Sequence, residues 1–474
     1  MSKFIKIIFF YPLYFLQLEN YQLKRFYRVY FKKAFALEKP RQKLVLTLKI
    51  KVLILVSAII ILLTGALFTC KFSVCWGIAV SCILALCFPF ILGLSVIILL
   101  PLDVLIKKLN IFQAQQKIKK LKNLKIIGIT GSYGKTSFKE ILAAILGVKY
   151  KVVYTPENKN TPLGISQVIL KNLKPETEIF VAEMSAWQKG DIKTLCQIAP
   201  PDIAVLTGIN ESHLERFKTI ENTISTKFEI VKYSKENSLV VLNADNDYII
   251  KNYKKYVGNK RVIFFSKENE NFLNYKIKEI TFNENTLKQN FILELEGKTY
   301  QFEIPFLGEY AVAMTIGAIL ISKYLNLNET EIKIGLSLLK PIKHRLQPTL
   351  RGDILIIDDS YNGNLNGVKE AIKVLSRFKN RRKIYVTPGL VETGSRNYEI
   401  HREIGKLLAP VADLVILIKN SVTNFIVEGL KENGFNPEKI IIYNTPFELE
   451  KNIKKIIKAN DVVLFQNDWP DNYL

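Results

Sequence analysis

Residues 124–136 read Leu-Lys-Ile-Ile-Gly-Ile-Thr-Gly-Ser-Tyr-Gly-Lys-Thr, and this stretch decides the class of fold. Leu124–Ile129 has the apolar character of a buried strand, a glycine-containing turn follows, and Ser137–Leu146 has the spacing of a helix. A strand, such a turn and a helix in this order are the context that a phosphate-binding loop requires. We therefore predict an α/β fold that binds a phosphorylated ligand at this turn.

The residue types in the turn suit nucleotide phosphates and a metal ion. Gly131 and Gly134 allow a tight turn whose backbone N–H groups point at phosphate oxygens. Lys135 would neutralise the outer phosphates, and the Thr136 hydroxyl would hold Mg²⁺. Ile129 stands where the general pattern has its first glycine, so an ordinary turn is the alternative, which the flanking strand and helix disfavour. The predicted loop consists of Thr130, Gly131, Ser132, Tyr133, Gly134, Lys135 and Thr136.

Length and charge narrow the classes of protein to which the chain can belong. Its 474 residues indicate two or three domains, and a hydrophobic content of 49% excludes wholesale disorder. Five cysteines without a Cys-x-x-Cys pair argue against a disulfide scaffold or a structural zinc site. The net charge of +24 would suit nucleic acid, but residues 1–125 alone carry +17. Because that region also holds the apolar runs, its basicity indicates a membrane surface and no nucleic acid.

Two uncharged runs predict a transmembrane hairpin. Val52–Cys70 is 19 residues long, about 28 Å as a helix, and Phe72–Leu102 adds 31 more. Two buried helices of a soluble core are the alternative, but neither run has a polar face. Both outer flanks are basic, so both ends of the hairpin would face the cytoplasm, at the inner membrane. The first 43 residues interleave aromatic and cationic side chains, which suits a helix in the lipid headgroup layer better than a nucleic-acid arm.

After residue 125 apolar strands alternate with amphipathic helices. Glu178–Met184 reads as a strand that ends in Glu183, Ile203–Thr207 reads as another, and Ile220–Ile230 is helical and contains Lys227. Arg261–Pro305 reads as short strands, beginning with Arg261–Ser266, of a small antiparallel appendage. Taken singly, a strand-end carboxylate, a loop histidine (His213) or a helical lysine would be unremarkable.

The alternation repeats after a hinge near Pro341 and Pro348. The later apolar runs predict a Rossmann-like domain, although no Gly-x-Gly-x-x-Gly is present to indicate dinucleotide binding. We thus expect a P-loop central domain with a mostly parallel sheet and a C-terminal Rossmann-like domain, preceded by an α-helical transmembrane hairpin. The predicted divisions are 1–43 (interfacial), 44–102 (two transmembrane helices), 103–124 (basic linker), 125–340 (central ATPase domain) and 341–474 (C-terminal ligase domain). The expected later strands are Ile354–Ile357, Ile384–Val386, Leu414–Ile418, Ile440–Ile442 and Val462–Leu464.

Together these motifs resemble the Mur ligase family of ATP-dependent amide-forming enzymes, over roughly residues 125–474. The match is similar above all to the branch that adds D-alanyl-D-alanine to UDP-N-acetylmuramoyl tripeptide. The motifs that carry the resemblance are the phosphate loop, Asn160-Thr161-Pro162, Glu183, His213, Lys227-Phe228-Glu229, His344-Arg345, Asp358–Asn362, Val386–Gly394 and His401.

The resemblance implies a role for each matching residue. Lys135 and its loop would hold ATP; Thr136 and Glu183 would bind one Mg²⁺ and His213 a second. Lys227 would become a carbamate by reaction with CO₂ and so serve as an anionic metal ligand. In the C-terminal part, Arg345 would contact the nucleotide phosphates and Asp359 the ribose. Asn160, Thr161, Tyr361 and Asn362 would serve the substrate and the junction between domains, and adenine would stack on Tyr310, which with Met314 replaces the family's polar adenine contacts.

The implied function is ATP-dependent peptide ligation in cell-wall precursor synthesis, through an acyl phosphate. The resemblance does not reach residues 1–120, where soluble members carry a domain that grips the UDP-sugar. The hairpin there leaves two acceptors open, a UDP-linked and a lipid-linked precursor, with an amino acid or D-alanyl-D-alanine as the other partner. A different amide ligase of the superfamily, such as a polyglutamate-forming enzyme, is one alternative. A membrane-tethered NTPase that ligates nothing is another, which the second metal cluster disfavours.

Overall fold

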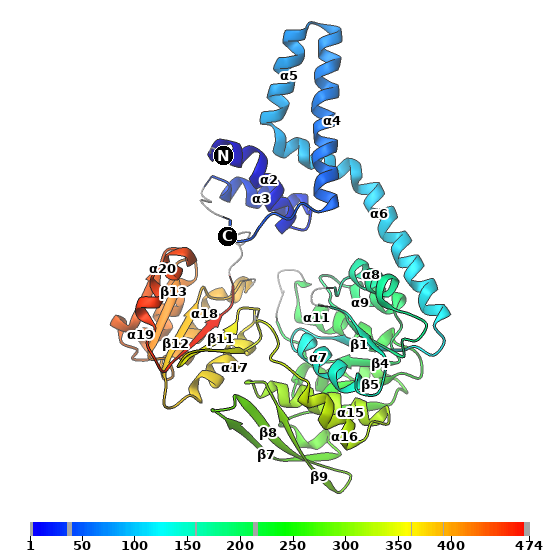
Figure 1. Cartoon of the computed structure of the whole chain (residues 1–474), viewed down its shortest axis with the longest axis vertical. Coiled ribbons are helices and arrows are strands. Elements are labelled where there is room, and N and C mark those ends of the chain that lie inside the picture. The colour runs from blue at the N-terminus through cyan, green and yellow to red at the C-terminus, as the bar shows by residue number, and fades with distance from the viewer. Residues whose placement is uncertain are drawn as a thin grey trace. The chain divides into compact units, whose positions relative to one another are not determined.

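The computed structural model describes residues 3–35, 40–156, 159–211, 217–361, 363–391 and 393–468, which form two compact units (Figure 1). The first unit takes the chain up to Leu109, and the second takes Asn110–Asp468. Helices are the only regular elements among the described residues of the first unit, and the second unit contains the sheets.

In the first unit, short aromatic helices pack on the base of a longer helical pair. Tyr14, Phe15 and Phe26 are buried against Leu53 and Leu92, so the amino-terminal segment forms a core with the hairpin as well as offering a basic face. Lys49 Nζ and Asp103 Oδ2 lie 2.5 Å apart in this unit. Its helices are α1 (Lys3–Ile5), the π-helix η1 (Lys6–Phe10), α2 (Tyr11–Leu18), α3 (Leu23–Lys33), α4 (Leu48–Lys71), α5 (Val74–Leu86) and the first part of α6 (Phe88–Lys120), which belongs to the second unit from Asn110 on.

Two helices, α4 and α6, are long and apolar enough to cross a membrane. The second does not begin at Phe72, as the uncharged run predicted, because a break at Cys87 divides that run into α5 and α6. Helix α6 continues to Lys120 through most of the segment predicted to be a linker. Helices α4 and α5 approach closely at Gly65 and Gly77, where an added Cβ would lie 2.0 and 1.8 Å from Ser81 Oγ and Thr69 Oγ1.

The second unit begins with a six-stranded sheet in which every strand pair is parallel, in the order β2-β3-β1-β4-β5-β6. Alternate side chains of its strands enter two cores on opposite faces, since successive strand residues point to opposite sides. Ile127 and Val181 pack with α7 and α15, whereas Ile126 and Phe180 pack with α8 and α9. The strands are β1 (Lys125–Thr130), β2 (Val152–Tyr154), β3 (Ile179–Glu183), β4 (Ile203–Leu206), β5 (Leu239–Asn243) and β6 (Val262–Phe265). The helices are α7 (Lys135–Leu146), α8 (Pro162–Asn172), α9 (Asp191–Ile198), α11 (Ile220–Lys227), α12 (Glu229–Lys232), α13 (Asp247–Asn252), α14 (Lys254–Val257), α15 (Tyr310–Tyr324) and α16 (Glu329–Ser337).

The predicted antiparallel appendage is present but one strand shorter than expected. It consists of β7 (Tyr275–Asn283), β8 (Lys288–Leu295) and β9 (Lys298–Ile304), after the short η2 (Glu270–Phe272). The assignment of Arg261–Ser266 to it was wrong, because that segment is β6, which pairs in parallel with β5. An apolar run identifies a strand without identifying its partner.

The C-terminal sheet is mixed, in the order β10-β11-β15-β12-β13-β14, with only β10 antiparallel to its neighbour. All five predicted strands are confirmed, and the Rossmann-like alternation with them. Pro348, predicted to lie at the hinge, falls within the edge strand β10. The strands are β10 (Gln347–Arg351), β11 (Ile354–Asp359), β12 (Arg382–Thr387), β13 (Leu414–Ile418), β14 (Ile440–Tyr443) and β15 (Asp461–Gln466). The helices are α17 (Leu365–Ser376), η3 (Gly394–Arg396), α18 (Asn397–Leu408), α19 (Thr423–Glu432), η4 (Pro437–Lys439) and α20 (Pro446–Ile456).

One carboxylate joins the two sheets' domains. Glu309, which precedes α15, forms ion pairs with Lys267 of the central domain, with Lys373 of α17 and with Arg377 directly after α17. Burial acts to raise the pKa of Glu309, but its hydrogen bonds and the neighbouring cations lower it to about 2. The charge of Glu309 therefore helps to hold α17 against the central domain.

Candidate functional site

The turn after β1 has the conformation of a phosphate-binding loop. Gly134 lies at φ 77°, a left-handed conformation that a side chain strains, and immediately precedes α7. The Thr207 hydroxyl lies within hydrogen-bonding distance of the carbonyl oxygens of Thr130 (3.2 Å) and Tyr133 (2.5 Å). The turn is thus fixed by the end of the neighbouring strand β4, and the amino end of α7 faces it.

A second contact supports the loop from the side. An added Cβ at Gly208 would lie only 2.2 Å from Cζ of Tyr133, so the tyrosine ring rests directly on this glycine. Asn246 Nδ2 donates to the Tyr133 hydroxyl (3.1 Å) and to the Ile209 carbonyl (2.8 Å). The Ser132 N–H donates to the Gly208 carbonyl (2.7 Å). The chain after β4 and the loop therefore form one packed assembly.

Glu183, at the carboxyl end of β3, lies beside this loop. Its side chain is buried, its Oε2 accepts from the Thr136 hydroxyl (3.0 Å), and its Oε1 accepts from Asn160 Nδ2 (3.0 Å). The structure thus brings together three of the predicted residues. Carboxylate and hydroxyl oxygens are ligands that Mg²⁺ prefers, so Thr136 and Glu183 fit the predicted ion. Within the described residues no three His, Cys, Asp or Glu side chains gather as a metal site, so nucleotide oxygens and water would complete its shell.

Lys135 folds back over the turn. Its Nζ donates to the Gly131 carbonyl (2.7 Å). Burial lowers the pKa of Lys135, the charge of Glu183 opposes that shift, and the charge of Arg345 adds to it. Lys135 therefore lies within electrostatic reach of one residue of the central domain and one of the C-terminal domain.

Lys227, at the end of α11, carries a buried amine that is affected by the charge of Lys135. Its Nζ lies 5.9 Å from the ring centroid of Phe217. Burial, followed by the charge of Lys135, lowers the pKa of Lys227 to about 7, against the opposing charges of Asp191 and Glu229. Near neutral pH a large fraction of this amine is uncharged, and only the uncharged amine reacts with CO₂.

Two residues of the C-terminal domain predicted to touch the nucleotide have protein partners in the structure. Asp359 is buried, and its carboxylate accepts from the Leu346 N–H (3.0 Å) and from Gln466 Nε2 (2.7 Å). Arg345 lies over the Tyr361 ring, with its guanidinium carbon 5.9 Å from the ring centroid. Ribose binding by Asp359 stays a prediction, in which the ribose would have to share or displace these partners.

Tyr310 lies between the cores of both domains. It packs against the central core and the C-terminal core. Burial, followed by the charge of Asp359, raises the pKa of Tyr310 to about 12, and a hydrogen bond to Ser137 opposes the shift. Its ring therefore contacts the domain junction and the start of α7, and stacking on adenine stays a prediction.

Three further predicted site residues remain. The Thr161 side chain caps α8 by accepting from the Gly164 N–H (3.2 Å), so its observed contact is local. His213 and Asn362 lie outside the described residues.

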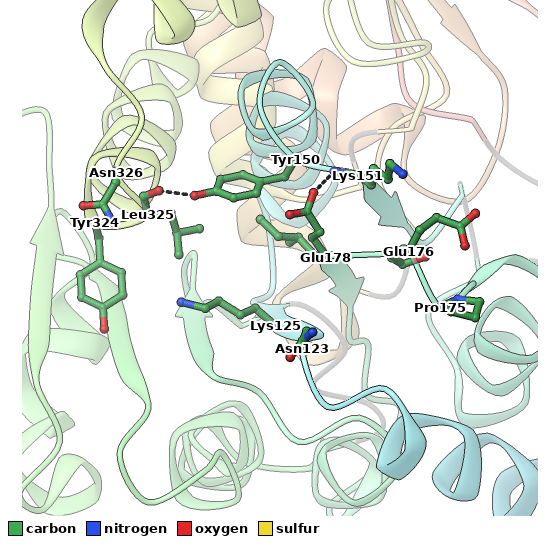
Figure 2. A pocket seen from close by; sticks show the side chains of 12 residues that line it. Asn123, Lys125, Tyr150, Lys151, Pro175, Glu176, Glu178, Tyr324, Leu325 and Asn326 are labelled. Carbon is green, nitrogen blue, oxygen red and sulfur yellow. Dashed lines mark hydrogen bonds between the residues drawn. The ribbon is translucent and has the colours of Figure 1, made fainter.

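The cavity in Figure 2 lies away from this site. It has a volume of about 530 Å³ and is lined by Lys125 and Ile179, the first residues of β1 and β3. Glu183 and the phosphate loop lie at the other end of those strands. The cavity is therefore not the predicted nucleotide site.

Sequence reasoning missed two side chains that the structure places in the site. Asn246 supports Tyr133, and Lys139, one turn along α7 from Lys135, approaches Glu183 Oε2 to 3.5 Å. A spacing of four residues on a helix could have indicated that Lys139 shares a face with Lys135. No local pattern links Asn246 to the loop, because the two are joined only in the tertiary structure.

The sequence and the fold are similar to those of known proteins. The Mur ligase middle domain matches residues 129–322, and the Mur ligase glutamate ligase domain matches residues 344–466. The crystal structure of MurF ligase from Thermotoga maritima in complex with ADP is 30% identical, covers 76% of this chain and 80% of its own, and superposes with a TM-score of 0.67. The chain belongs to the Mur ligase family.

Curated relatives point to one branch of that family. UDP-N-acetylmuramoyl-tripeptide–D-alanyl-D-alanine ligase of Buchnera aphidicola is 32% identical over 61% of this chain and 62% of its own length. The protein of that name from Bacillus subtilis is 28% identical over 72% of each. The match thus spans somewhat less than two thirds of the Buchnera protein, and the two matching family domains of this chain lie in the second unit.

Proposed function

We propose that the protein is an ATP-dependent amide ligase that joins D-alanyl-D-alanine to a UDP-N-acetylmuramoyl tripeptide. The observation that carries this proposal is the Glu183–Thr136 pair beside the phosphate loop, together with a buried Lys227 amine whose pKa the charge of Lys135 helps to lower. Two Mur ligase domains match residues 129–322 and 344–466, and relatives with this named activity are 28–32% identical to the chain.

The chemistry needs an activated carboxylate, because a carboxylate and an amine do not form an amide readily at neutral pH. Transfer of a phosphoryl group from ATP to the acceptor carboxylate gives an acyl phosphate, and attack by the dipeptide amine releases phosphate and forms the amide. Lys135 would leave the Gly131 carbonyl for the phosphates, and the N–H groups of the turn would hold them at the start of α7. Arg345 would add positive charge from the C-terminal domain.

Metal ions would lie among Thr136, Glu183, His213 and Lys227. Bound there, Mg²⁺ would offset the charge that develops on the transferred phosphoryl group. Asn160 would orient the Glu183 carboxylate, whose Oε1 it already contacts. The Lys227 amine would lose a proton and add to CO₂ to give a carbamate, which a buried amine with a pKa near 7 favours. A protonated lysine could not serve as a metal ligand.

We further propose that α4 and α6 anchor the enzyme in the cytoplasmic membrane, with both flanks and the catalytic domains on the cytoplasmic side. The length and composition of the two helices support the anchor. Basic residues outside both apolar runs support the orientation. An anchored ligase could take a lipid-linked precursor in place of the UDP-linked one, which the assay below distinguishes.

The test is a ligation assay on the full chain in detergent, with ATP and Mg²⁺. D-Alanyl-D-alanine is offered with either a UDP-linked or a lipid-linked tripeptide, and products are identified by mass. The proposal expects the UDP-linked acceptor to gain one dipeptide less one water, with one ADP per product. If product forms only with the lipid-linked tripeptide, that tripeptide is the acceptor and the UDP-linked one is not. ATP hydrolysis that needs neither acceptor nor dipeptide would contradict ligation and favour a tethered NTPase.

A further inference from the structure

Lys139 is a buried cation whose ammonium lacks hydrogen-bond partners. Its side chain has no exposed surface, and its Nζ makes no hydrogen bond among the described residues. The two nearest carboxylate oxygens are Glu140 Oε1 at 3.3 Å and Glu183 Oε2 at 3.5 Å. The Tyr154 ring centroid lies 5.9 Å away. Buried charges are costly unless they are paired and hydrogen-bonded, so this position calls for an explanation.

A purely structural role explains it poorly. Glu140 is one-third exposed, so water can solvate its carboxylate without Lys139. A buried ion pair is often no more stabilising than apolar residues of the same volume. Methionine, which has a similar length, would fill the space on α7 without a buried charge. The feature that distinguishes this site is therefore the charge of Lys139 beside Glu183.

That charge lies where the proposed metal would be. Glu183 Oε2 accepts from the Thr136 hydroxyl, and the same oxygen is the one nearest to Lys139. The charge of Glu183 also acts on Lys135, so one buried glutamate interacts with two lysines before the nucleotide binds. A divalent cation alone meets repulsion there, whereas the phosphates of a nucleotide bring the negative charge that compensates it.

We propose that Lys139 is a positioning residue that holds the Glu183 carboxylate in the nucleotide-free enzyme and makes metal binding depend on the nucleotide. The proposal rests on the proposed nucleotide and metal site. It adds an order of binding: the cation enters with the triphosphate, or after it, and does not occupy the site alone. Because such coupling is reciprocal, Lys139 increases both the gain in metal affinity caused by the nucleotide and the gain in nucleotide affinity caused by the metal.

The test compares Mn²⁺ affinity, by electron paramagnetic resonance, in the full-length wild type and Lys139→Met, without nucleotide. We expect Lys139→Met to bind Mn²⁺ roughly 5- to 150-fold more tightly, the usual range of such couplings. The gain in Mn²⁺ affinity on adding a non-hydrolysable ATP analogue should fall by the same factor. Lys139→Arg, which keeps the charge, should behave as the wild type, and Lys174→Met at an exposed position serves as the matched control.

Unchanged or weaker Mn²⁺ binding in folded Lys139→Met would overturn the proposal. If Lys139→Met does not fold, Lys139→Gln and Lys139→Arg are compared, and equal Mn²⁺ affinities in these two would overturn it as well. A wild type that binds Mn²⁺ and the ATP analogue together, with no effect of Lys139→Met, refutes this inference alone. A wild type that binds neither refutes the proposed function.

Discussion

Gly208→Ala should weaken the nucleotide site although it replaces no residue predicted to bind ATP. The added Cβ would lie 2.2 Å from Cζ, 2.5 Å from Cε1 and 2.6 Å from the hydroxyl oxygen of Tyr133. Ordinary contacts begin near 3.4 Å, so the ring must move by about 1 Å. Because Tyr133 belongs to the phosphate loop, its displacement changes the loop.

The magnitude follows from the cost of overpacking, which is about 1–3 kcal/mol. If the loop bears that cost, ATP affinity falls by roughly 5- to 150-fold, since 1.4 kcal/mol is a factor of ten. Calorimetric titration of the purified chain with a non-hydrolysable ATP analogue measures this loss. Circular dichroism should show that the variant keeps its fold, because the strain falls on a loop that contacts solvent on one side.

A second substitution identifies the cause. In a Tyr133→Leu background the ring is absent, so Gly208→Ala should cost much less affinity there than in the wild type. An unchanged affinity in Gly208→Ala would refute the reasoning. So would an equal loss in both backgrounds, because the contact between the glycine and the ring would then not support the loop.

Three more outcomes follow from the same structure. Because the carboxyl pKa of Glu309 is lowered to about 2, its stabilisation is present above the unfolded value of about 4.3 and is lost as pH falls from there toward 2. Partial exposure reduces the effect to about 1–2 kcal/mol, which thermal unfolding of Glu309→Gln against wild type should show at pH 7 and not at pH 2. Lys227→Ala should abolish ligation, and short carboxylic acids should restore part of it by replacing the carbamate. Since the amine of Lys227 is uncharged above about pH 7, ¹³C NMR with labelled CO₂ should detect more carbamate as pH rises through that value. The full chain should float with liposomes, and deletion of residues 1–102, which removes the predicted interfacial segment and both apolar runs, should abolish flotation.

Each of these has a contradicting result. Equal stability of Glu309→Gln and wild type at pH 7 would remove the interdomain ion pairs from the stability of the fold. Persistent ligation in Lys227→Ala without added acid would remove Lys227 from the mechanism. Flotation that survives the deletion would place membrane binding elsewhere in the chain.

The strands and the phosphate loop were predictable because each depends on a short stretch of consecutive residues. A buried strand is an apolar run of fixed length, and Gly131 to Thr136 follows β1 directly. The pairing of β6 was not predictable in this way, because strand partners are chosen by tertiary packing. The break at Cys87 was missed because a run without charges gives no sign of where a helix ends.

The site was predictable only where residues act through their own chemistry. Thr136 and Glu183 meet as expected, since the carboxyl ends of parallel strands share an edge of the sheet, and Asn160, predicted to serve the substrate, also contacts Glu183. Lys139 and Asn246 act through neighbours that are far away in the sequence. Lys139 is in addition one of many lysines in the chain. Asp359 was predicted to face a ligand, but its position at the end of β11 also lets it bind Gln466 of β15.

The central claim is that this pocket uses ATP to phosphorylate a carboxylate, and transfer of oxygen tests it most directly. The acceptor tripeptide is labelled with ¹⁸O in its terminal carboxylate and ligated to D-alanyl-D-alanine with unlabelled ATP. The account predicts inorganic phosphate that carries one ¹⁸O atom from each turnover, measured by mass. The amine attacks the acyl carbon, so the C–O bond of the acyl phosphate breaks and the carboxylate oxygen leaves with the phosphate. Phosphate without label, or label in AMP, would contradict it.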